Sequence, residues 1–257
     1  MRIVIVTQEE PFYIPILLRN LLNRQRNIDG IILLPDLPHG FTRLSYFKRL
    51  FDVFGPIDFL KFGILYVHYK LADAIAVVWV LNRYYSVEST AKKWNIPLYI
   101  LKDINSQEAL RILKMLEPDI LISVAASQIF KKDAIRSSKH TINIHAALLP
   151  HNKGMMPSFW ALANGETETG ITVHYVDEDI DAGDILFQRA FEISPDDTLH
   201  SLQTKVAHFG SDALIEVITM LENGKMETRK PQGEESYFSF PTKAAAQAFR
   251  ARGRRFI

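Results

Sequence analysis

Two polar side chains lie two positions apart at the end of a predicted buried strand. The strand covers residues 141–145, with the sequence TINIH, and the polar pair is Asn143 and His145. Residues two apart in a strand point to the same side of a sheet, so the amide and the imidazole would project together. An amide donor beside an imidazole can polarise a carbonyl, stabilise an oxyanion and relay a proton. The pair alone is weak evidence, because most such pairs only complete hydrogen bonds at a strand end.

A carboxylate-rich loop lies between the next two predicted strands. It covers residues 176–185, with the sequence VDEDIDAGDI, and Gly183 allows a tight turn in it. A loop of this composition can be a solvated surface loop or a cation site. An Asp placed beside His145 would instead orient the imidazole and raise its pKa, as general acid–base chemistry requires.

The elements that would position these groups alternate between strands and helices. Short β-branched or apolar runs predict buried strands, and amphipathic stretches between them predict helices. The predicted strands are residues 2–6, 30–35, 96–101, 119–126 and 141–145, followed by a pair at 170–177 and 184–193. This order predicts an α/β fold: a Rossmann-like, mostly parallel sheet flanked by helices, which binds its ligands at the carboxyl ends of the strands.

The last strong element is an amphipathic helix over residues 198–224, for which we expect Asp197 as N-cap and Gly224 at the end. Residues 41–84 break the α/β alternation. They are rich in Phe, Leu, Tyr and basic residues, are interrupted at Gly55-Pro56, and predict inserted helices. We therefore expect a catalytic domain over residues 1–225 that contains a helical insertion at about 41–84. Residues 226–257 would form a short C-terminal extension packed on the core.

Composition narrows the function classes. Of the 257 residues, 47% are apolar and 23% are charged, and the net charge is +1. These values fit a soluble globular protein and give no global electrostatic case for nucleic-acid binding. The absence of cysteine excludes disulfides, thiolate nucleophiles and Cys-ligated metals. No Gly-x-Gly-x-x-Gly or Walker loop follows the first strand, no His/carboxylate spacing indicates a metal, and His174 is expected to be a structural histidine.

The sequence gives less direct information about the cellular location of the protein. The most apolar window, residues 62–81, is interrupted by His68, Lys70 and Asp73, which argues against a transmembrane helix. A peripheral membrane contact or a partner surface stays open for this window, and so does a homo-oligomer. The N-terminal residues contain too short an apolar run for a signal peptide, so we expect a cytoplasmic protein. The basic run at residues 250–257 predicts a solvated tail.

The segment INIHAALLPHNKGMMPSFWALANGETETGITVHYVDEDIDAGDIL, residues 142–186, closely resembles the signature of the 10-formyltetrahydrofolate-dependent formyltransferases. That signature runs roughly Asn-x-His-x-Ser-Leu-Leu-Pro-x-x-Arg-Gly, then Gly-x-Thr, and ends in Asp-x-Gly-Asp. The resemblance implies a catalytic trio of Asn143, His145 and Asp181, with 10-formyltetrahydrofolate as formyl donor and no metal. Asn143 and His145 would stabilise the oxyanion formed when an amine attacks the formyl carbon. Asp181 would hold the His145 imidazole in place and favour its protonated, charged form.

The same resemblance implies the binding residues. For the pterin of the donor they are Ser127, Gln128, Ile129 and Phe130, the wall residue Leu148, and the loop residues Val176, Asp177, Glu178 and Asp179. For the acceptor we expect Lys153 and Gly154, with Phe159 and Trp160 as candidate lining residues that could equally be core aromatics. Two positions depart from the signature: Ala147 replaces its Ser, and Lys153 replaces its Arg. The lysine keeps a charge but not a planar bidentate fork, which puts its role in acceptor binding in doubt.

The identity of the amine acceptor is less constrained. Methionyl-tRNA formyltransferases add a large C-terminal domain that grips tRNA, whereas only a short extension is present here. Glycinamide ribonucleotide formyltransferases carry a Gly/Ser-rich phosphate loop after the first strand, and the acidic, Gly-free TQEEPFYIP stands in its place. The layout is nearest to the sugar N-formyltransferases, so we expect a nucleotide-linked amino sugar as acceptor. A 10-formyltetrahydrofolate hydrolase and a non-catalytic homologue remain as alternatives.

Overall fold

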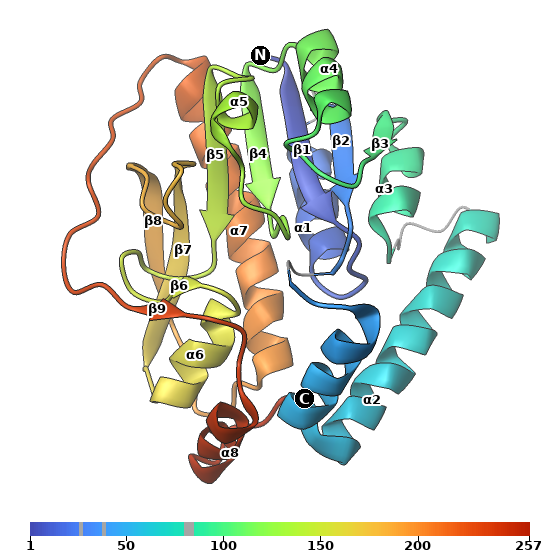
Figure 1. The fold of residues 1–257 in the computed structure, drawn as a ribbon, viewed down its shortest axis with the longest axis vertical. Helices are drawn as coiled ribbons and strands as arrows, with labels where there is room; N and C mark the ends of the chain where they lie inside the picture. Colours follow the sequence, from blue (N-terminus) through green and yellow to red (C-terminus); the bar gives the residue numbers. More distant parts are fainter. Residues whose placement is uncertain (26–27, 38–39, 80–84) are drawn as a thin grey trace.

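A seven-stranded sheet forms the centre of the protein (Figure 1). The computed structural model describes residues 1–25, 28–37, 40–79 and 85–257. The strand order is β3-β2-β1-β4-β5-β7-β8. The strands are β1 (Ile3–Gln8), β2 (Ile28–Leu34), β3 (Leu98–Ile100), β4 (Ile120–Val124), β5 (His140–His145), β7 (Glu168–Tyr175) and β8 (Ile185–Glu192). The first five are parallel, and β7 and β8 add an antiparallel edge, which confirms the mostly parallel, Rossmann-like fold.

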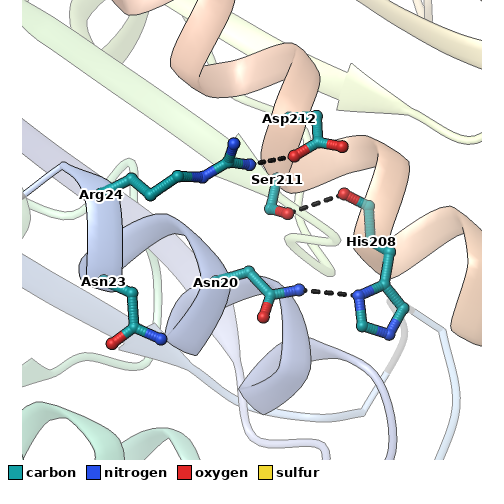
Figure 2. Close-up of a pocket in the computed structure, with 6 residues that line it drawn as sticks. All are labelled: Asn20, Asn23, Arg24, His208, Ser211 and Asp212. Atoms are coloured by element: carbon teal, nitrogen blue, oxygen red, sulfur yellow. Dashed lines mark hydrogen bonds and ion pairs between the residues drawn. The ribbon is translucent and has the colours of Figure 1, made fainter.

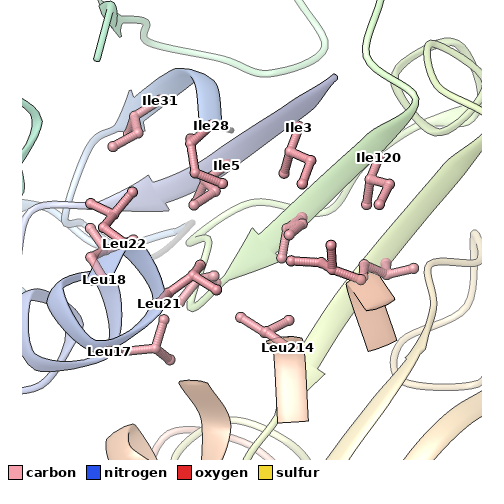
Figure 3. Close-up of a cluster of buried hydrophobic side chains, with 14 of the residues drawn as sticks. Ile3, Ile5, Leu17, Leu18, Leu21, Leu22, Ile28, Ile31, Ile120 and Leu214 are labelled. Atoms are coloured by element: carbon pink, nitrogen blue, oxygen red, sulfur yellow. The ribbon is translucent and has the colours of Figure 1, made fainter. Parts of the chain in front are cut away.

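Helices cover both faces of this sheet. On one face, α1 (Ile14–Arg24), α3 (Val87–Lys93) and α7 (Leu199–Glu222) bury the largest apolar cluster, which Figure 3 shows around Ile5, Leu21 and Leu214. On the other face lie α4 (Gln107–Leu116) and α5 (Lys132–Ile135). The central strands β1 and β4 are covered on both faces, which is why residues 3–6 of β1 and all but Ser123 of β4 are apolar.

The N-cap of the long helix α7 lies one residue after the expected position. Thr198, not Asp197, is the N-cap: its side chain accepts from the Ser201 amide, and the Ser201 side chain completes a capping box. Asp197 instead accepts hydrogen bonds from the Ser201 hydroxyl and from Lys205. At the other end, Gly224 takes a positive φ of 63° and donates to the carbonyl of Leu221.

The described part of the predicted insertion forms a kinked element, α2 (Arg43–Trp79), whereas residues 80–84 of that prediction lie outside the described residues. Gly55, with φ 65° and ψ 172°, breaks the helix directly before Pro56 and divides α2 into two segments. The segments pack against each other through aromatic pairs, Phe51 with Phe59 and Phe54 with Phe62, whose centroids lie 5.5 and 4.8 Å apart. Within the described residues, no helix is both long and apolar enough to cross a membrane.

The chain after residue 225 packs on the segment that follows β5. The short strands β6 (Lys153–Gly154) and β9 (Tyr237–Phe238) pair in parallel, and α8 (Lys243–Ala251) lies against α6 (Pro157–Asn164). Together with the start of α7 they bury a separate aromatic cluster that includes Phe159, Phe249 and Phe256. The C-terminal extension therefore supports the chain immediately downstream of His145.

Candidate active site

The antiparallel pairing of β5 with β7 creates the site. In its register Asn143 lies opposite His174, and His145 lies opposite Thr172, at the carboxyl end of β5. The amide Nδ2 of Asn143 lies 3.2 Å from Nε2 of His174. His174 was expected to be a structural histidine; its side chain is only 3% exposed, and its Nε2 lies near both Asn143 and Asp181 of the predicted trio. The missed signal is the register, because a strand residue opposite Asn143 must project to the same side.

Backbone carbonyls fix the tautomers of both histidines. Nε2 of His145 lies 2.8 Å from the carbonyl oxygen of Asn152, and Nδ1 of His174 lies 2.8 Å from that of Tyr175. Because a carbonyl oxygen only accepts, each of these ring nitrogens must carry its proton and donate it. In the neutral forms, Nδ1 of His145 and Nε2 of His174 are therefore unprotonated.

Asp181 lies between these two unprotonated nitrogens. Its Oδ2 is 3.5 Å from Nδ1 of His145, and its Oδ1 is 3.5 Å from Nε2 of His174. The Gly154 amide donates to Oδ2 at 2.8 Å and fixes the carboxylate. The loop that carries Asp181 closes against β7 at Gly183, where a Cβ would overlap the Tyr175 carbonyl, so only glycine fits without displacing the loop.

Burial sets the proton affinities in this cluster. Burial lowers the pKa of His145 below its usual 6.5, although Asp181 and the bond to Asn152 act in the opposite direction. Asp181 does raise this pKa, as expected, but the cost of desolvating an imidazolium is larger, so the net pKa of His145 is lowered. For Asp181 burial raises the pKa, but the two histidines and the Gly154 amide outweigh it and lower the pKa to about 2.

The cluster combines three capabilities. Asn143 uses one amide proton toward His174 and keeps a second for an oxyanion. Asp181 is a carboxylate at neutral pH, and each of its oxygens faces an unprotonated ring nitrogen. One proton can therefore be held between the carboxylate and either imidazole. Such an arrangement suits proton transfer at a polarised carbonyl.

The residues expected to bind the pterin fall into two groups. Phe130 is buried in the cluster against which Val176 packs, so the 127–130 segment and the 176–179 loop do come together. Ser127 and Gln128 are tied down, because they donate to the carbonyls of Pro35 and Lys102. Ile129 is 60% exposed.

The other residues expected to bind the pterin lie in or near the loop at residues 176–179. Asp177, Glu178 and Asp179 are exposed. A hollow of about 190 Å³ is lined by residues 176–178, by Lys132 of α5 and by its C-cap Arg136. Leu148 is half-buried and packs over Gly170 of β7, where a Cβ would overlap it. Ile180, directly before Asp181, is 43% exposed.

The residues expected to bind the acceptor have different environments. Phe159 has no exposed surface and stacks on Phe249 with centroids 5.2 Å apart, so it is a core residue and the acceptor-lining expectation for it is wrong. Trp160 is half-buried and stacks on Phe238 at 4.5 Å. Lys153 is nearly buried, with Nζ 3.0 Å from Oε2 of Glu235 in the C-terminal extension. Gly154, with φ 94°, positions Asp181 through its amide.

Asn152 is a further residue that the sequence analysis did not single out. Its carbonyl accepts from His145, and its buried side chain donates to both carboxylate oxygens of Glu166 at 3.0 Å. Its φ of 56° places it in the left-handed region, which Asn tolerates better than most residues. The tautomer of His145 thus depends on a strained residue held by Glu166.

A larger hollow, of about 340 Å³, lies between α1 and α7 (Figure 2). Its polar groups satisfy one another: Arg24 pairs with Asp212, and Asn20 bonds His208. None of the catalytic trio lines it, and we assign it no chemistry. Among the described residues, no group of three or more His, Asp or Glu side chains is arranged to hold a metal ion.

Known proteins resemble this chain in sequence and in fold. A family model described as formyl transferase matches residues 82–218. The methionyl-tRNA formyltransferase of Anaeromyxobacter sp. (strain K) is 38% identical over 142 residues, which are 53% of this chain and 46% of that protein. The chain thus spans about half the length of the curated relatives it matches.

Solved structures share the fold at lower identity. An N-formyltransferase from Helicobacter canadensis, solved with folinic acid and dTDP-3-aminofucose, is 21% identical with a TM-score of 0.59, covering 93% of this chain and 71% of that one. The phosphoribosylglycinamide formyltransferase of Anaplasma phagocytophilum is 18% identical with a TM-score of 0.61, covering 93% and 98%. The family match covers more than half of the sequence, including every member of the cluster around Asp181, and the chain belongs to the formyl transferase family.

Proposed function

We propose that this protein transfers the formyl group of 10-formyltetrahydrofolate to a primary amine. The observation that carries the proposal is the carboxylate of Asp181, held between two imidazoles of fixed tautomer and beside the amide of Asn143. In the transfer, a bond forms between the amine nitrogen and the formyl carbon, and the bond from that carbon to the folate nitrogen breaks. The amine loses a proton, and the folate nitrogen gains one.

Each residue of the cluster has a role in this transfer of the formyl group and the proton. The free amide proton of Asn143 meets the negative charge that develops on the formyl oxygen. Asp181 and the unprotonated Nδ1 of His145 take up the proton of the amine and return it to the leaving nitrogen. His174 orients Asn143, because its unprotonated Nε2 accepts from the Asn143 amide. Asn152 keeps Nε2 of His145 protonated, so that Nδ1 is the nitrogen that exchanges protons.

The donor fits the edge formed by residues 127–130 and 176–180. Phe130 and Val176 form an apolar floor, and Ile129 and Ile180 leave apolar surface uncovered, as a flat aromatic ring system requires. The tethered side chains of Ser127 and Gln128 leave the backbone of this segment as the source of polar contacts. These assignments belong to the proposal and are tested through donor binding.

For the acceptor, we infer that the α1 N-terminus does not bind a phosphate group. The carboxyl group of Glu10 accepts from the amides of Phe12, Tyr13 and Ile14 at 2.6, 2.7 and 3.0 Å. These are the donors that an anion would use at a helix N-terminus. Burial raises the pKa of Glu10 to about 7, and the group fills the position in either protonation state. This disfavours glycinamide ribonucleotide.

The basic C-terminal run offers little to a nucleic acid. The guanidinium of Arg250 donates to the carbonyls of Val53 and Phe54, and Arg254 and Arg255 donate to carbonyls of the loop at residues 194–196. These arginines serve as structural donors and do not form a free basic patch. The expectation of a solvated tail holds for residues 250–253 and 255, which are exposed, but not for Phe256, which is buried.

An exposed aromatic surface borders the site instead. Tyr237 is 58% exposed and lies beside Gly154, whose amide holds Asp181. The half-buried Trp160 stacks on Phe238 next to it. Aromatic faces beside a formyl-transfer site suit the base and sugar rings of a nucleotide-linked amino sugar. The sugar N-formyltransferases among the solved structures, one of them complexed with dTDP-3-aminofucose, are consistent with this acceptor class.

The test is an acceptor panel. The protein is incubated with 10-formyltetrahydrofolate alone, with dTDP- and UDP-linked amino sugars, with glycinamide ribonucleotide, and with charged methionyl-tRNA, and released tetrahydrofolate is measured. We expect release only with amino sugars, and a KM raised by a factor on the order of ten in Tyr237→Ala with little change in kcat. Release with methionyl-tRNA alone would refute the sugar acceptor, and release without any amine would indicate a hydrolase.

A further inference from the structure

The helix α2 carries most of the large apolar side chains that are exposed in the described part of the chain. Its large apolar side chains that are at least 46% exposed are Leu44, Phe47, Phe51, Ile57, Leu60, Ile64, Tyr66, Val67, Leu71 and Ile75. If a large side chain presents about 200 Å² in full, these ten expose on the order of 1,000 Å². A typical monomer exposes a largest apolar patch of only about 300–600 Å². Such a face is expected to be covered by something.

The orientation of α2 leaves these residues outside. In the segment after Gly55, the exposed residues recur every three or four positions from Ile57 to Ile75, which places them on one side of the helix. The opposite side contacts the body of the protein. Phe62 and Tyr69 meet Phe12 at 5.9 and 5.6 Å, and Asp73 accepts hydrogen bonds from Ser86 and Ser89. Figure 1 shows the segment along the outer edge of the molecule.

The charges on this face have one sign. Arg43, Lys48 and Lys61 are exposed on α2. The acidic residues of the helix are only partly exposed, and two of them are engaged: Asp58 with Lys61 and Arg250, and Asp73 with the serines of α3 and its cap. The face therefore presents apolar side chains bordered by cations, with no exposed carboxylate among the described residues of α2.

We propose that this face of α2 docks on the surface of a bilayer that contains anionic lipids. Apolar side chains bordered by basic ones are what a helix lying in the lipid interface requires. The exposed apolar residues continue on both sides of the kink at Gly55, which a fluid surface can follow and a straight partner helix cannot. A second copy of the chain would add further basic residues and supply no countercharge.

Packing contacts connect this face of α2 to the elements that support the proposed active site. α2 packs on α8, and Phe62 lies 6.3 Å from His200 at the start of α7. These elements adjoin the same aromatic cluster that supports the chain after His145. Docking through α2 would therefore hold the amine-accepting side of the protein close to the headgroups. The inference does not depend on the proposed formyl transfer, because its test measures binding alone.

The test uses vesicle sedimentation of the full chain. We expect the protein to sediment with vesicles of phosphatidylcholine and phosphatidylglycerol, and on the order of ten times more weakly with phosphatidylcholine alone or at high salt. The double variant Ile64→Ser/Leu71→Ser is expected to lose binding by a factor of about ten or more. The matched control is Ile100→Ser/Met115→Ser, which removes apolar side chains of similar exposure outside α2 and is expected to bind normally.

Other outcomes would overturn the proposal. Equal binding of the α2 variant and the control variant would do so, and so would no sedimentation of the wild-type protein with either vesicle. A dimer by light scattering that Ile64→Ser/Leu71→Ser dissociates, without vesicle binding, would assign the face to a second copy. If the double variant fails to fold by circular dichroism, Lys48→Glu at an exposed position replaces it and is expected to weaken anionic-vesicle binding severalfold.

Discussion

The substitution Asp181→Asn removes the charge of the cluster and keeps its shape. An asparagine oxygen can still accept from the Gly154 amide, now 2.8 Å from Oδ2, so the loop should stay in place. What is lost is the attraction between the carboxylate and a protonated His145, whose Nδ1 is 3.5 Å away. At an effective dielectric constant of about 20, this attraction amounts to roughly 5 kcal/mol. If the imidazole is charged in the transition state, kcat should fall by a factor on the order of 10³.

Two measurements check this reasoning. Tetrahydrofolate release in the presence of an active amine gives kcat, and NMR titration of the His145 ring gives its pKa, which should fall further below 6.5 in the variant because the charge that opposes desolvation is gone. Asp184→Asn is the matched control, since Asp184 lies in the same loop but pairs with Lys230 at 2.7 Å. A near-normal kcat in Asp181→Asn, or an unchanged titration of His145, would refute the assigned role.

Three further outcomes are expected. The pKa of Asp181 falls from 3.8 to about 2 on folding, so the ionised carboxylate contributes about 2 kcal/mol to the free energy of unfolding above pH 4, and this contribution is lost as the pH falls through 2. The urea midpoint of Asp181→Asn should therefore depend less on pH in this window than that of the wild type. Gly183→Ala should cost about 2–4 kcal/mol of unfolding free energy and most activity, because its Cβ meets the Tyr175 carbonyl; a normal melting temperature would contradict this. Trp160→Leu, which loses the stack on Phe238, should make the chain after residue 225 easier to cleave in limited proteolysis, whereas an unchanged digest would show that this stack does not hold it.

The sequence predicted the sheet because strand and helix periodicities are local signals. The strand at 141–145 and the pair at 170–177 and 184–193 all exist within a residue or two. The kink of α2 was also predictable, since Gly55-Pro56 cannot continue a helix. The candidate trio came from a contiguous signature, and the structure brings Asn143, His145 and Asp181 to one place.

The site features that the sequence did not predict depend on contacts between residues that lie far apart in the chain. His174 joins the site only through the β5–β7 register, and Asn152 only through its carbonyl bond to His145. Phe159 was ambiguous because a short helix shows which face is apolar but not whether another element covers it. The C-terminal extension covers that face. The net pKa of His145 required knowledge of burial, which a sequence pattern does not give.

The central claim is that the cluster at the end of β5 performs formyl transfer, and mass spectrometry of the acceptor tests it most directly. A nucleotide-linked amino sugar is incubated with 10-formyltetrahydrofolate and either the wild-type protein, His145→Ala, or His151→Ala, a control at an exposed histidine of the same segment. We predict that the wild type and His151→Ala add one formyl group to the amine, and that His145→Ala does so more slowly by a factor on the order of 10²–10⁴. Formylation by His145→Ala at the wild-type rate would contradict the account.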